Sequence, residues 1–224
     1  MTTTVQIRPQ VAHSLRTAPI IGVVRTSSRE EAARQARIFA SSGIELIEIT
    51  FTVPGASGLV REILSTSARE GREGDGPPWI GMGTVTTEAR AREAAAAGAQ
   101  FLVTPNVSPA VARVARENDL FLVLGALTAT EIVEAHELGA DIVKVFPLPP
   151  VGGPAYLSVV RGPLGDIPML AAGGFGIEEI PAYTAVGASA FGIGAPLLGA
   201  DEEETRRRIA RGLELARKGR EESR

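Results

Sequence analysis

Short runs of hydrophobic residues recur along the chain and alternate with longer segments whose hydrophobic positions have a helical spacing. In most runs the hydrophobic residues are consecutive rather than alternating, which is typical of strands buried on both faces of a parallel sheet. The eight runs span residues 20–24, 46–51, 79–83, 101–105, 121–126, 142–146, 169–174 and 190–194. The pattern therefore predicts eight parallel strands that alternate with about as many helices.

Glycines and hydroxyl residues mark the ends of several predicted helices. A glycine that precedes the next hydrophobic run by two or three residues predicts a helix-to-strand turn, because glycine tolerates the left-handed conformation that ends a helix. Four positions have this pattern: Gly43, Gly98, Gly139 and Gly187. Ser28 with Glu31, and Thr128 with Glu131, have the spacing of a capping box and predict helix starts.

This alternation predicts an α/β fold, a (β/α)8 TIM barrel that forms one domain over residues 1–224 with its core over about 18–200. The alternative is an open doubly wound sheet. That fold is disfavoured because no G-x-G-x-x-G sequence follows the first predicted strand, which leads into Arg25-Thr-Ser-Ser.

The ends of the chain add two predicted helices. Residues 10–17 are expected to form a short extra helix that closes the bottom of the barrel, and about 202–220 are expected to form a last amphipathic helix. We expect residues 1–9 to be loose and residues 71–78, which are rich in glycine and proline, to form a flexible surface loop.

Composition narrows the range of partners. The net charge is −3, the pI is near 5.6 and only 4% of residues are aromatic, so the chain lacks the basic stripe with stacking rings that nucleic-acid binding uses. Its early hydrophobic stretch is far too short for a membrane span, so no membrane partner is expected. The absence of cysteine fits a cytoplasmic protein and leaves no thiol nucleophile.

Lysine is rare in this chain, with two lysines against 21 arginines, and one of them lies inside a hydrophobic run. Lys144 in a predicted strand suggests a role that arginine cannot perform, namely to lose a proton and attack a carbonyl carbon. The alternative is a structural lysine at a strand end, with its stem buried and its amine in water.

Glu48 lies between Ile47 and Ile49 in a predicted buried strand. A buried carboxylate is costly unless it is paired or protonated, so Glu48 is a candidate general acid and base with a raised pKa. The alternative is a structural ion pair with Arg25 or Lys144. A lysine and a glutamate that project into one barrel mouth are the minimal set of groups for Schiff-base chemistry.

The chemistry of a barrel lies at the C-terminal ends of its strands, and the residues predicted there are mostly polar or glycine. Gly173, Gly174 and the segment that ends at Gly194 occupy positions where barrels commonly bind phosphate, although tight packing would also explain them. The only histidines, His13 and His136, fall on predicted helices, so we expect neither a metal site nor metal-dependent catalysis.

Five segments, in their order and spacing, resemble the pyruvate-dependent aldolases of the 2-keto-3-deoxy-6-phosphogluconate type, including the 6-phosphogalactonate branch. They are Leu46-Ile-Glu-Ile-Thr50, Gly81-Met-Gly-Thr-Val85, Val103-Thr-Pro-Asn106, Lys144-Val-Phe-Pro147 and Ala172-Gly-Gly174. The resemblance covers about residues 19–198. It implies a metal-independent class I aldolase that needs no cofactor, acts on a small keto-deoxy sugar acid and forms a homotrimer.

The resemblance also implies roles for residues. Lys144 would form the Schiff base, Glu48 would donate and accept protons, and Thr84 would bind the pyruvate carboxylate. Gly173, Gly174 and the Gly194 region would hold a phosphate. The substrate-binding set that it implies is Arg25, Thr52, Thr84, Pro105, Phe146, Ala172, Gly173, Gly174, Gly194 and Ala195.

Three positions depart from the gluconate-type pattern. Thr52 stands where an arginine grips the carboxylate, and Arg25, present as in the galactonate branch, is expected to replace it. Ala172 stands where a threonine precedes the paired glycines, and Ala195 where a serine often helps to bind phosphate. These changes affect the positions that select the sugar acid.

The sequence thus predicts cleavage of a 2-keto-3-deoxy-6-phospho sugar acid, of gluconate or galactonate type, to pyruvate and glyceraldehyde 3-phosphate. One alternative is a pyruvate aldolase for non-phosphorylated 2-keto acids such as 4-hydroxy-2-oxoglutarate. Another is a phosphosugar isomerase or binding barrel that has no covalent step.

Overall fold

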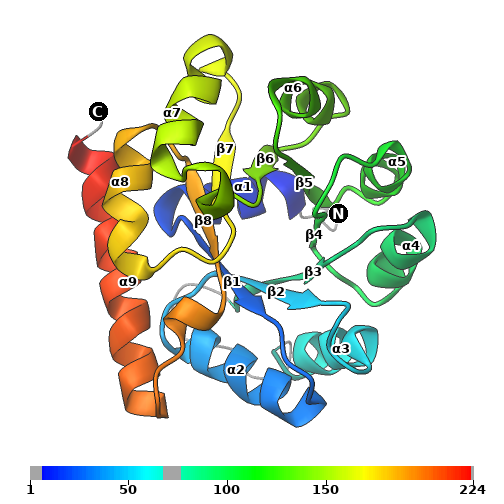
Figure 1. Ribbon diagram of the computed structural model, residues 1–224. Coiled ribbons are helices and arrows are strands. Elements are labelled where there is room, and N and C mark those ends of the chain that lie inside the picture. Colours follow the sequence, from blue (N-terminus) through cyan, green and yellow to red (C-terminus); the bar gives the residue numbers. More distant parts are fainter. Residues whose placement is uncertain (1–6, 68–76, 223–224) are drawn as a thin grey trace, which may run out of the picture.

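The computed structural model describes residues 7–67 and 77–222, and over them eight parallel strands close into a barrel with helices around it (Figure 1). The strands are β1 (Ile20–Val24), β2 (Leu46–Thr50), β3 (Trp79–Gly83), β4 (Phe101–Val103), β5 (Phe121–Ala126), β6 (Ile142–Val145), β7 (Met169–Ala172) and β8 (Ala190–Ile193). Each strand pairs with the next, and β8 pairs with β1 to close the barrel. The predicted (β/α)8 barrel is confirmed, and the open sheet is excluded.

Helices connect the strands and cover the outside of the barrel. The α-helices are α1 (Ile7–Thr17), α2 (Arg29–Ser41), α3 (Ala56–Ser67), α4 (Glu88–Ala96), α5 (Pro109–Glu117), α6 (Ala129–Glu137), α7 (Pro154–Arg161), α8 (Ile180–Ala185) and α9 (Glu202–Glu222). Short 3-10 turns are η1 (Pro149–Val151), η2 (Gly162–Leu164), η3 (Ile177–Glu179) and η4 (Ala195–Leu197). None of the helices within residues 7–67 and 77–222 is long and apolar enough to cross a membrane.

The predicted helix ends are largely confirmed. The four turn glycines have φ values of 86° to 91°, in the left-handed region. Thr128 and Glu131 form a complete capping box at the start of α6. Ser28 caps α2, but the side chain of Glu31 binds Arg34 and Gln35 instead of reaching back to the cap. The charged guanidinium is the stronger hydrogen-bond donor, which explains the difference.

Several predicted boundaries were wrong by a few residues. Helix α1 starts at Ile7, so residues 7–9 are helical rather than loose, while residues 1–6 and 71–76 lie outside the described part of the chain. Several strands end one or two residues earlier than predicted. After β4, for example, the hydroxyl of Thr104 accepts the N–H of Gly125 at 2.9 Å, so a side chain takes the place of the next backbone hydrogen bond.

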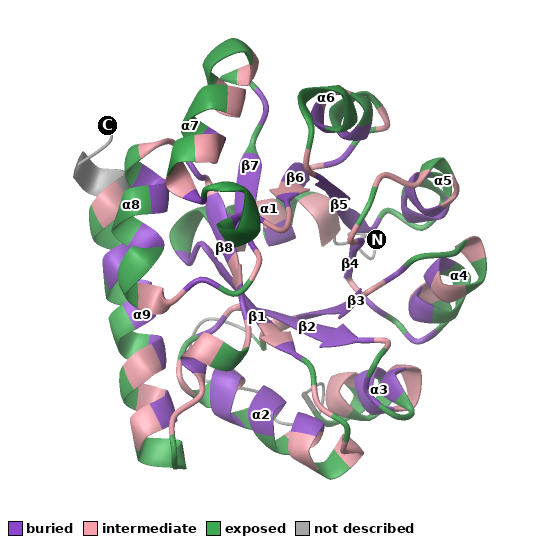
Figure 2. Cartoon of the chain, in the orientation of Figure 1, coloured by how far each residue is buried: buried purple, intermediate pink, exposed green. Residues whose placement is uncertain are grey.

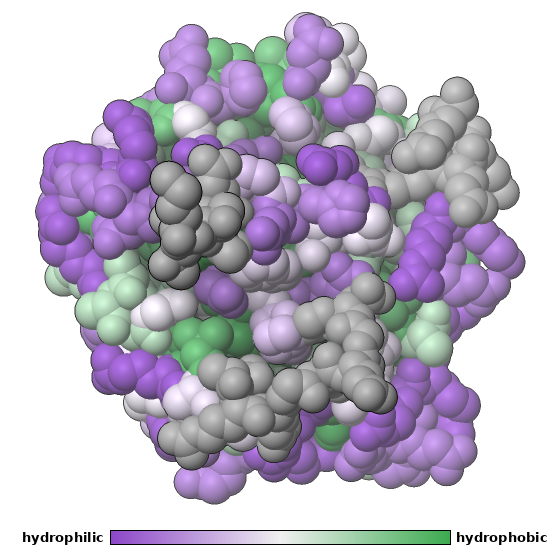
Figure 3. Space-filling view, turned by 180° about the vertical axis from the view of Figure 1, so that it is seen from behind, coloured by the Kyte–Doolittle hydropathy of each residue, from purple (hydrophilic) through white to green (hydrophobic). Residues whose placement is uncertain are grey.

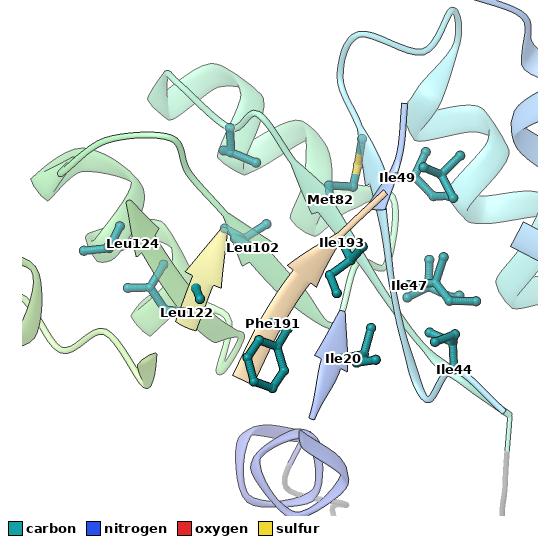
Figure 4. Close-up of a cluster of buried hydrophobic side chains, with 14 of the residues drawn as sticks. Ile20, Ile44, Ile47, Ile49, Met82, Leu102, Leu122, Leu124, Phe191 and Ile193 are labelled. Atoms are coloured by element: carbon teal, nitrogen blue, oxygen red, sulfur yellow. The ribbon is translucent and has the colours of Figure 1, made fainter. Parts of the chain in front are cut away.

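Two hydrophobic layers follow from the alternation of side chains along each strand. The outward side chains, including Ile47, Leu102 and Phe191, pack against the helices and form the main core (Figure 4). Figure 2 shows the same division, with buried strands and helices that are exposed only on their outer sides. Figure 3 shows the molecule from behind, where hydrophilic residues make up most of the visible surface.

Apolar inward side chains pack against α1 at one end of the barrel. Val11 and Leu15 of α1 pack with Ile21, Leu46 and Phe101, which lie inside the barrel near the start of their strands. This confirms that the N-terminal helix closes the bottom of the barrel. The polar inward-facing residues therefore lie towards the opposite end, where the strands finish.

Candidate active site

Glu48 and Lys144 both face the inside of the barrel. Their neighbours along β2 and β6, Ile47 with Ile49 and Val143 with Val145, belong to the outer core, so the residues between them must point inward. Register places Glu48 beside Val23 and Gly81, and Lys144 beside Gly125 and Leu170. Parallel strands thus bring a carboxyl and an amine from opposite halves of the sequence into one interior.

The carboxyl group of Glu48 is deeply buried and incompletely bonded. The residue is 2% exposed, and its Oε1 atom has no hydrogen-bond partner within the described structure. Burial raises the pKa of Glu48 above its ordinary value of 4.5, while the positive charges of Lys144 and then Arg25 oppose that rise. A carboxyl group with a raised pKa and a free oxygen can take up and return a proton.

Gly83 makes room for this carboxyl group. A Cβ atom at Gly83 would lie 1.6 Å from Oε1 of Glu48, so the carboxyl group would have to leave this position. Gly83 pairs with Thr50 at the end of β3. The glycine is therefore part of the site, because it lets the carboxyl lie directly against the neighbouring strand.

Lys144 is half-buried and lies beside an aromatic ring. Its Nζ atom is 5.0 Å from the ring centroid of Phe146, which follows β6. Within residues 7–67 and 77–222, no ion pair is formed between Lys144 and Glu48 or between Arg25 and Glu48. The structural ion pair considered for Glu48 therefore does not form, and the positive charges of Lys144 and Arg25 act on its carboxyl group without an ion-pair contact.

Arg25 and Thr84 meet at the mouth of the barrel. The Nη2 atom of Arg25, which follows β1, donates a hydrogen bond to Oγ1 of Thr84 at 3.3 Å. Thr84 follows β3 and has a φ of 59°, a conformation that is unusual for a β-branched residue. A guanidinium and a hydroxyl at one point form a suitable ligand pair for a carboxylate.

Sequence reasoning missed Arg90, in the first turns of α4. Its Nη1 atom donates to the carbonyl oxygen of Thr84 at 3.2 Å and to Oγ1 of Thr86 at 2.9 Å. Its guanidinium carbon lies 5.3 Å from the ring centroid of Phe51. The one available signal was its position shortly after a strand end, which many charged residues of this chain share.

The hydroxyl group of Thr52 is hydrogen-bonded to the end of β2, the strand that precedes it. Its hydroxyl lies 2.7 Å from that of Thr50, which is buried and donates to the carbonyl oxygen of Val24 at 3.0 Å. The hydrogen of Thr50 is thus used, so Thr52 donates to Thr50. Thr52 therefore supplies no positive charge, and its hydroxyl proton is already used in a hydrogen bond.

Packing accounts for two of the three glycines predicted to hold phosphate. A Cβ at Gly173 would lie 2.7 Å from Cδ of Pro149, and one at Gly194 would lie 2.8 Å from the carbonyl oxygen of Val23. Gly174 has a φ of 92° and open space where a side chain would be. Gly173 lies beside the segment that follows Lys144, and Gly194 lies beside β1, so both border the mouth.

The remaining predicted residues line the ends of β4, β7 and β8. Pro105 packs over Gly125, where a Cβ would lie 2.3 Å from the carbonyl carbon of Pro105. Ala172 is 3% exposed and faces the barrel interior, whereas Ala195 is exposed in η4.

The histidines lie where the sequence predicted, His13 on α1 and His136 on α6, and both are exposed. Across residues 7–67 and 77–222, no three His, Cys, Asp or Glu side chains gather in an arrangement that could hold a metal ion.

Comparison with known proteins identifies the family of this chain. The family model for KDPG and KHG aldolase matches residues 11–211. The chain is 31% identical over 175 residues to a 2-dehydro-3-deoxy-phosphogluconate aldolase of Treponema pallidum (strain Nichols), which covers 78% of this chain and 80% of that protein. It is 32% identical over 180 residues to a probable 2-dehydro-3-deoxy-6-phosphogalactonate aldolase of Rhizobium meliloti (strain 1021), which covers 80% and 81%.

A solved structure described as "Native KDPGal structure" superimposes with a TM-score of 0.80 at 27% identity, covering 91% of this chain and 96% of that one. These findings confirm the resemblance inferred from the sequence. The chain belongs to the KDPG and KHG aldolase family.

Proposed function

We propose that this protein is a class I aldolase that cleaves a 2-keto-3-deoxy-6-phospho sugar acid, of gluconate or galactonate type, to pyruvate and glyceraldehyde 3-phosphate. The observation that carries the proposal is the placement of Lys144 and the buried, incompletely bonded Glu48 inside one barrel mouth. The names of the relatives support the substrate class, since they are aldolases of phosphorylated keto-deoxy sugar acids.

The proposed reaction begins at Lys144. Its neutral amine attacks the C2 carbonyl carbon, and loss of water gives a protonated imine. The C3–C4 bond then breaks, its electron pair moves into the imine to form the enamine of pyruvate, and the C4 hydroxyl loses its proton to Glu48 as the aldehyde forms. Glu48 next returns a proton to C3, and water hydrolyses the imine to release pyruvate.

The surrounding residues support this sequence of steps. The raised pKa of Glu48 suits a group that must both accept and donate a proton. Arg25 and Thr84 are proposed to bind the carboxylate of the keto acid, because they are already joined at the mouth. Pro105 and Phe146 are proposed to form its walls, with Thr52 and Ala172 beside the sugar chain. The backbone of Gly173, Gly174, Gly194 and Ala195 is proposed to hold the phosphate.

Trapping the Schiff base tests the proposal. Incubation with pyruvate and borohydride should leave a reduced, covalent adduct that peptide mass spectrometry assigns to Lys144. The Lys144→Met variant should lose both the adduct and the cleavage activity. Lys218→Met is the matched control, because Lys218 is exposed on α9 and pairs only with Glu214 among the described residues.

The competing functions give different results. An isomerase or a non-catalytic binding barrel would form no adduct, since neither needs an imine. An adduct that persists in Lys144→Met would show that another amine reacts, and either outcome would sink the Schiff-base mechanism.

We also propose that the protein acts as a homotrimer in the cytoplasm. The family resemblance supports the trimer, and the absence of cysteine fits a reducing compartment. Exposed Val151 and Val159, on η1 and α7, offer an apolar surface for contact between copies.

A further inference from the structure

We propose that Arg90 is a positioning residue for the carboxylate of the keto acid, and that it acts by holding Thr84 in its left-handed conformation. The inference rests on the proposed aldolase function and adds a residue to the carboxylate site. No motif in the sequence singled it out.

Thr84 needs such support because its backbone is in an unfavourable conformation. A φ of 59° brings the β-branched side chain close to its own backbone, so neighbouring groups must hold it there. Two guanidinium groups contact Thr84: Arg25 donates to the side-chain oxygen at 3.3 Å and Arg90 to the carbonyl oxygen at 3.2 Å. Arg25 holds the hydroxyl group of Thr84, and Arg90 holds the backbone carbonyl group of the same residue.

Arg90 is itself held firmly enough to serve this purpose. The same Nη1 atom donates to Thr86 at 2.9 Å, and the guanidinium lies over the ring of Phe51. Phe51 in turn donates its backbone N–H to the carbonyl oxygen of Gly83 at 2.9 Å. Arg90 thus joins the segment that follows β2, through Phe51, to the segment that follows β3, which contains Thr84.

Arg90 forms no ion pair with the described residues, whereas Arg92 on the same helix pairs with Glu88 and Glu117. An unneutralised cation that contacts the backbone of Thr84 favours an anionic substrate group nearby. Such a charge matters here because Thr52 occupies the place of the arginine expected after strand two and donates its proton to Thr50. The guanidinium of Arg90 lies over the ring of Phe51, the residue that precedes Thr52, so its positive charge lies beside the segment that follows β2.

The test uses exchange of the pyruvate methyl protons with deuterated water, followed by NMR at increasing pyruvate concentration. Arg90→Met removes the donors but keeps an unbranched apolar chain over Phe51. It should raise the KM for pyruvate by about tenfold or more, the size expected for loss of a charged hydrogen bond. At saturating pyruvate it should still give the Lys144 adduct. Arg92→Met, the control, should keep the wild-type KM.

A second pair of variants separates positioning from direct binding. Thr84→Val removes the hydroxyl that Arg90 is proposed to position, so adding Arg90→Met to it should change the KM by less than about threefold. Fully additive effects would show that Arg90 acts independently of Thr84, and an unchanged KM in Arg90→Met would show that it has no role. Either result overturns the inference.

Should Arg90→Met fail to fold, Arg90→Lys provides the same measurement, since a single ammonium cannot reproduce both hydrogen bonds of the guanidinium. A raised KM supports the inference and a wild-type KM overturns it. Failure of the wild-type protein to form any borohydride adduct would instead refute the proposed aldolase function.

Discussion

Glu48 combines features that a purely structural residue would avoid. Its carboxyl group is buried, one oxygen lacks a hydrogen bond within the described structure, and the adjacent strand has a glycine so that the group fits. An unsatisfied buried oxygen destabilises the fold, and such costs are retained mainly where function needs them. At the residue scale these features support the proposed role of Glu48 as a proton donor and acceptor.

Replacing Glu48 by glutamine should separate its catalytic and structural effects. We expect Glu48→Gln to slow exchange of the pyruvate methyl protons by at least ~10²-fold, because the amide cannot relay a proton. The Lys144 adduct should still form on prolonged incubation with borohydride. Exchange at the wild-type rate would make Glu48 a structural residue. Glu45→Gln, at the half-buried residue immediately before β2, is the control.

The same variant should show a pH-dependent change in stability. Burial raises the pKa of Glu48 in the folded state, so the folded chain holds this proton more tightly than the unfolded chain. As pH rises from about 4.5 through the raised pKa, the unfolded state ionises first and the free energy of unfolding falls. The stability of Glu48→Gln relative to wild type should thus increase with pH, as followed by denaturant titrations. A difference that stays constant with pH would contradict the raised pKa.

At the scale of elements, the site is built by the loops that leave the strands. The segment after β6 is joined to the end of β7, because the N–H of Leu148 donates to the carbonyl oxygen of Ala172 at 3.1 Å. Gly173 then packs directly against Pro149, and Gly194 packs against β1. These close contacts leave Gly174 as the open position of the paired glycines. Any anion held there would be bound mainly by backbone N–H groups.

A phosphate pocket at these loops predicts a preference between substrates. The kcat/KM for a 2-keto-3-deoxy-6-phospho sugar acid should exceed that for the same acid without phosphate by about tenfold or more, the effect of one charged hydrogen bond. Steady-state kinetics on the two compounds measure this directly. Equal efficiency would contradict the phosphate pocket and favour a substrate such as 4-hydroxy-2-oxoglutarate.

At the scale of the whole molecule, the barrel separates stability from chemistry. Helix α1 and the apolar inward residues seal one end, and the outer core packs each strand against its helix. The opposite end can then carry buried polar groups without disturbing the rest of the fold. Exposed Val159 of α7 lies on the outside of this arrangement, on the face proposed for contact with a second copy.

The proposed trimer predicts the mass in solution. Light scattering should give a mass three times that of the 23.4 kDa chain. A charge at Val159, which is 76% exposed, should weaken the assembly if this face is the interface, so Val159→Glu should shift the mass towards that of one chain. Ala210→Glu, at an exposed position of α9, is the control. A wild-type protein with the mass of one chain would contradict the trimer.

The sequence by itself determined the barrel, because hydrophobic spacing and turn glycines are local signals that report burial and chain reversal. It also identified Lys144 and Glu48 as candidate catalytic residues, since a lysine and a carboxylate inside predicted buried strands are unusual on the sequence alone. Only the tertiary structure decided what surrounds them. The space that Gly83 gives to Glu48, the engagement of Thr52 by Thr50 and the contact between Arg90 and Thr84 depend on loop conformation and on side-chain geometry. Hydrophobic periodicity reports which face of a strand is buried, but it carries no information about where the chain turns after the strand ends.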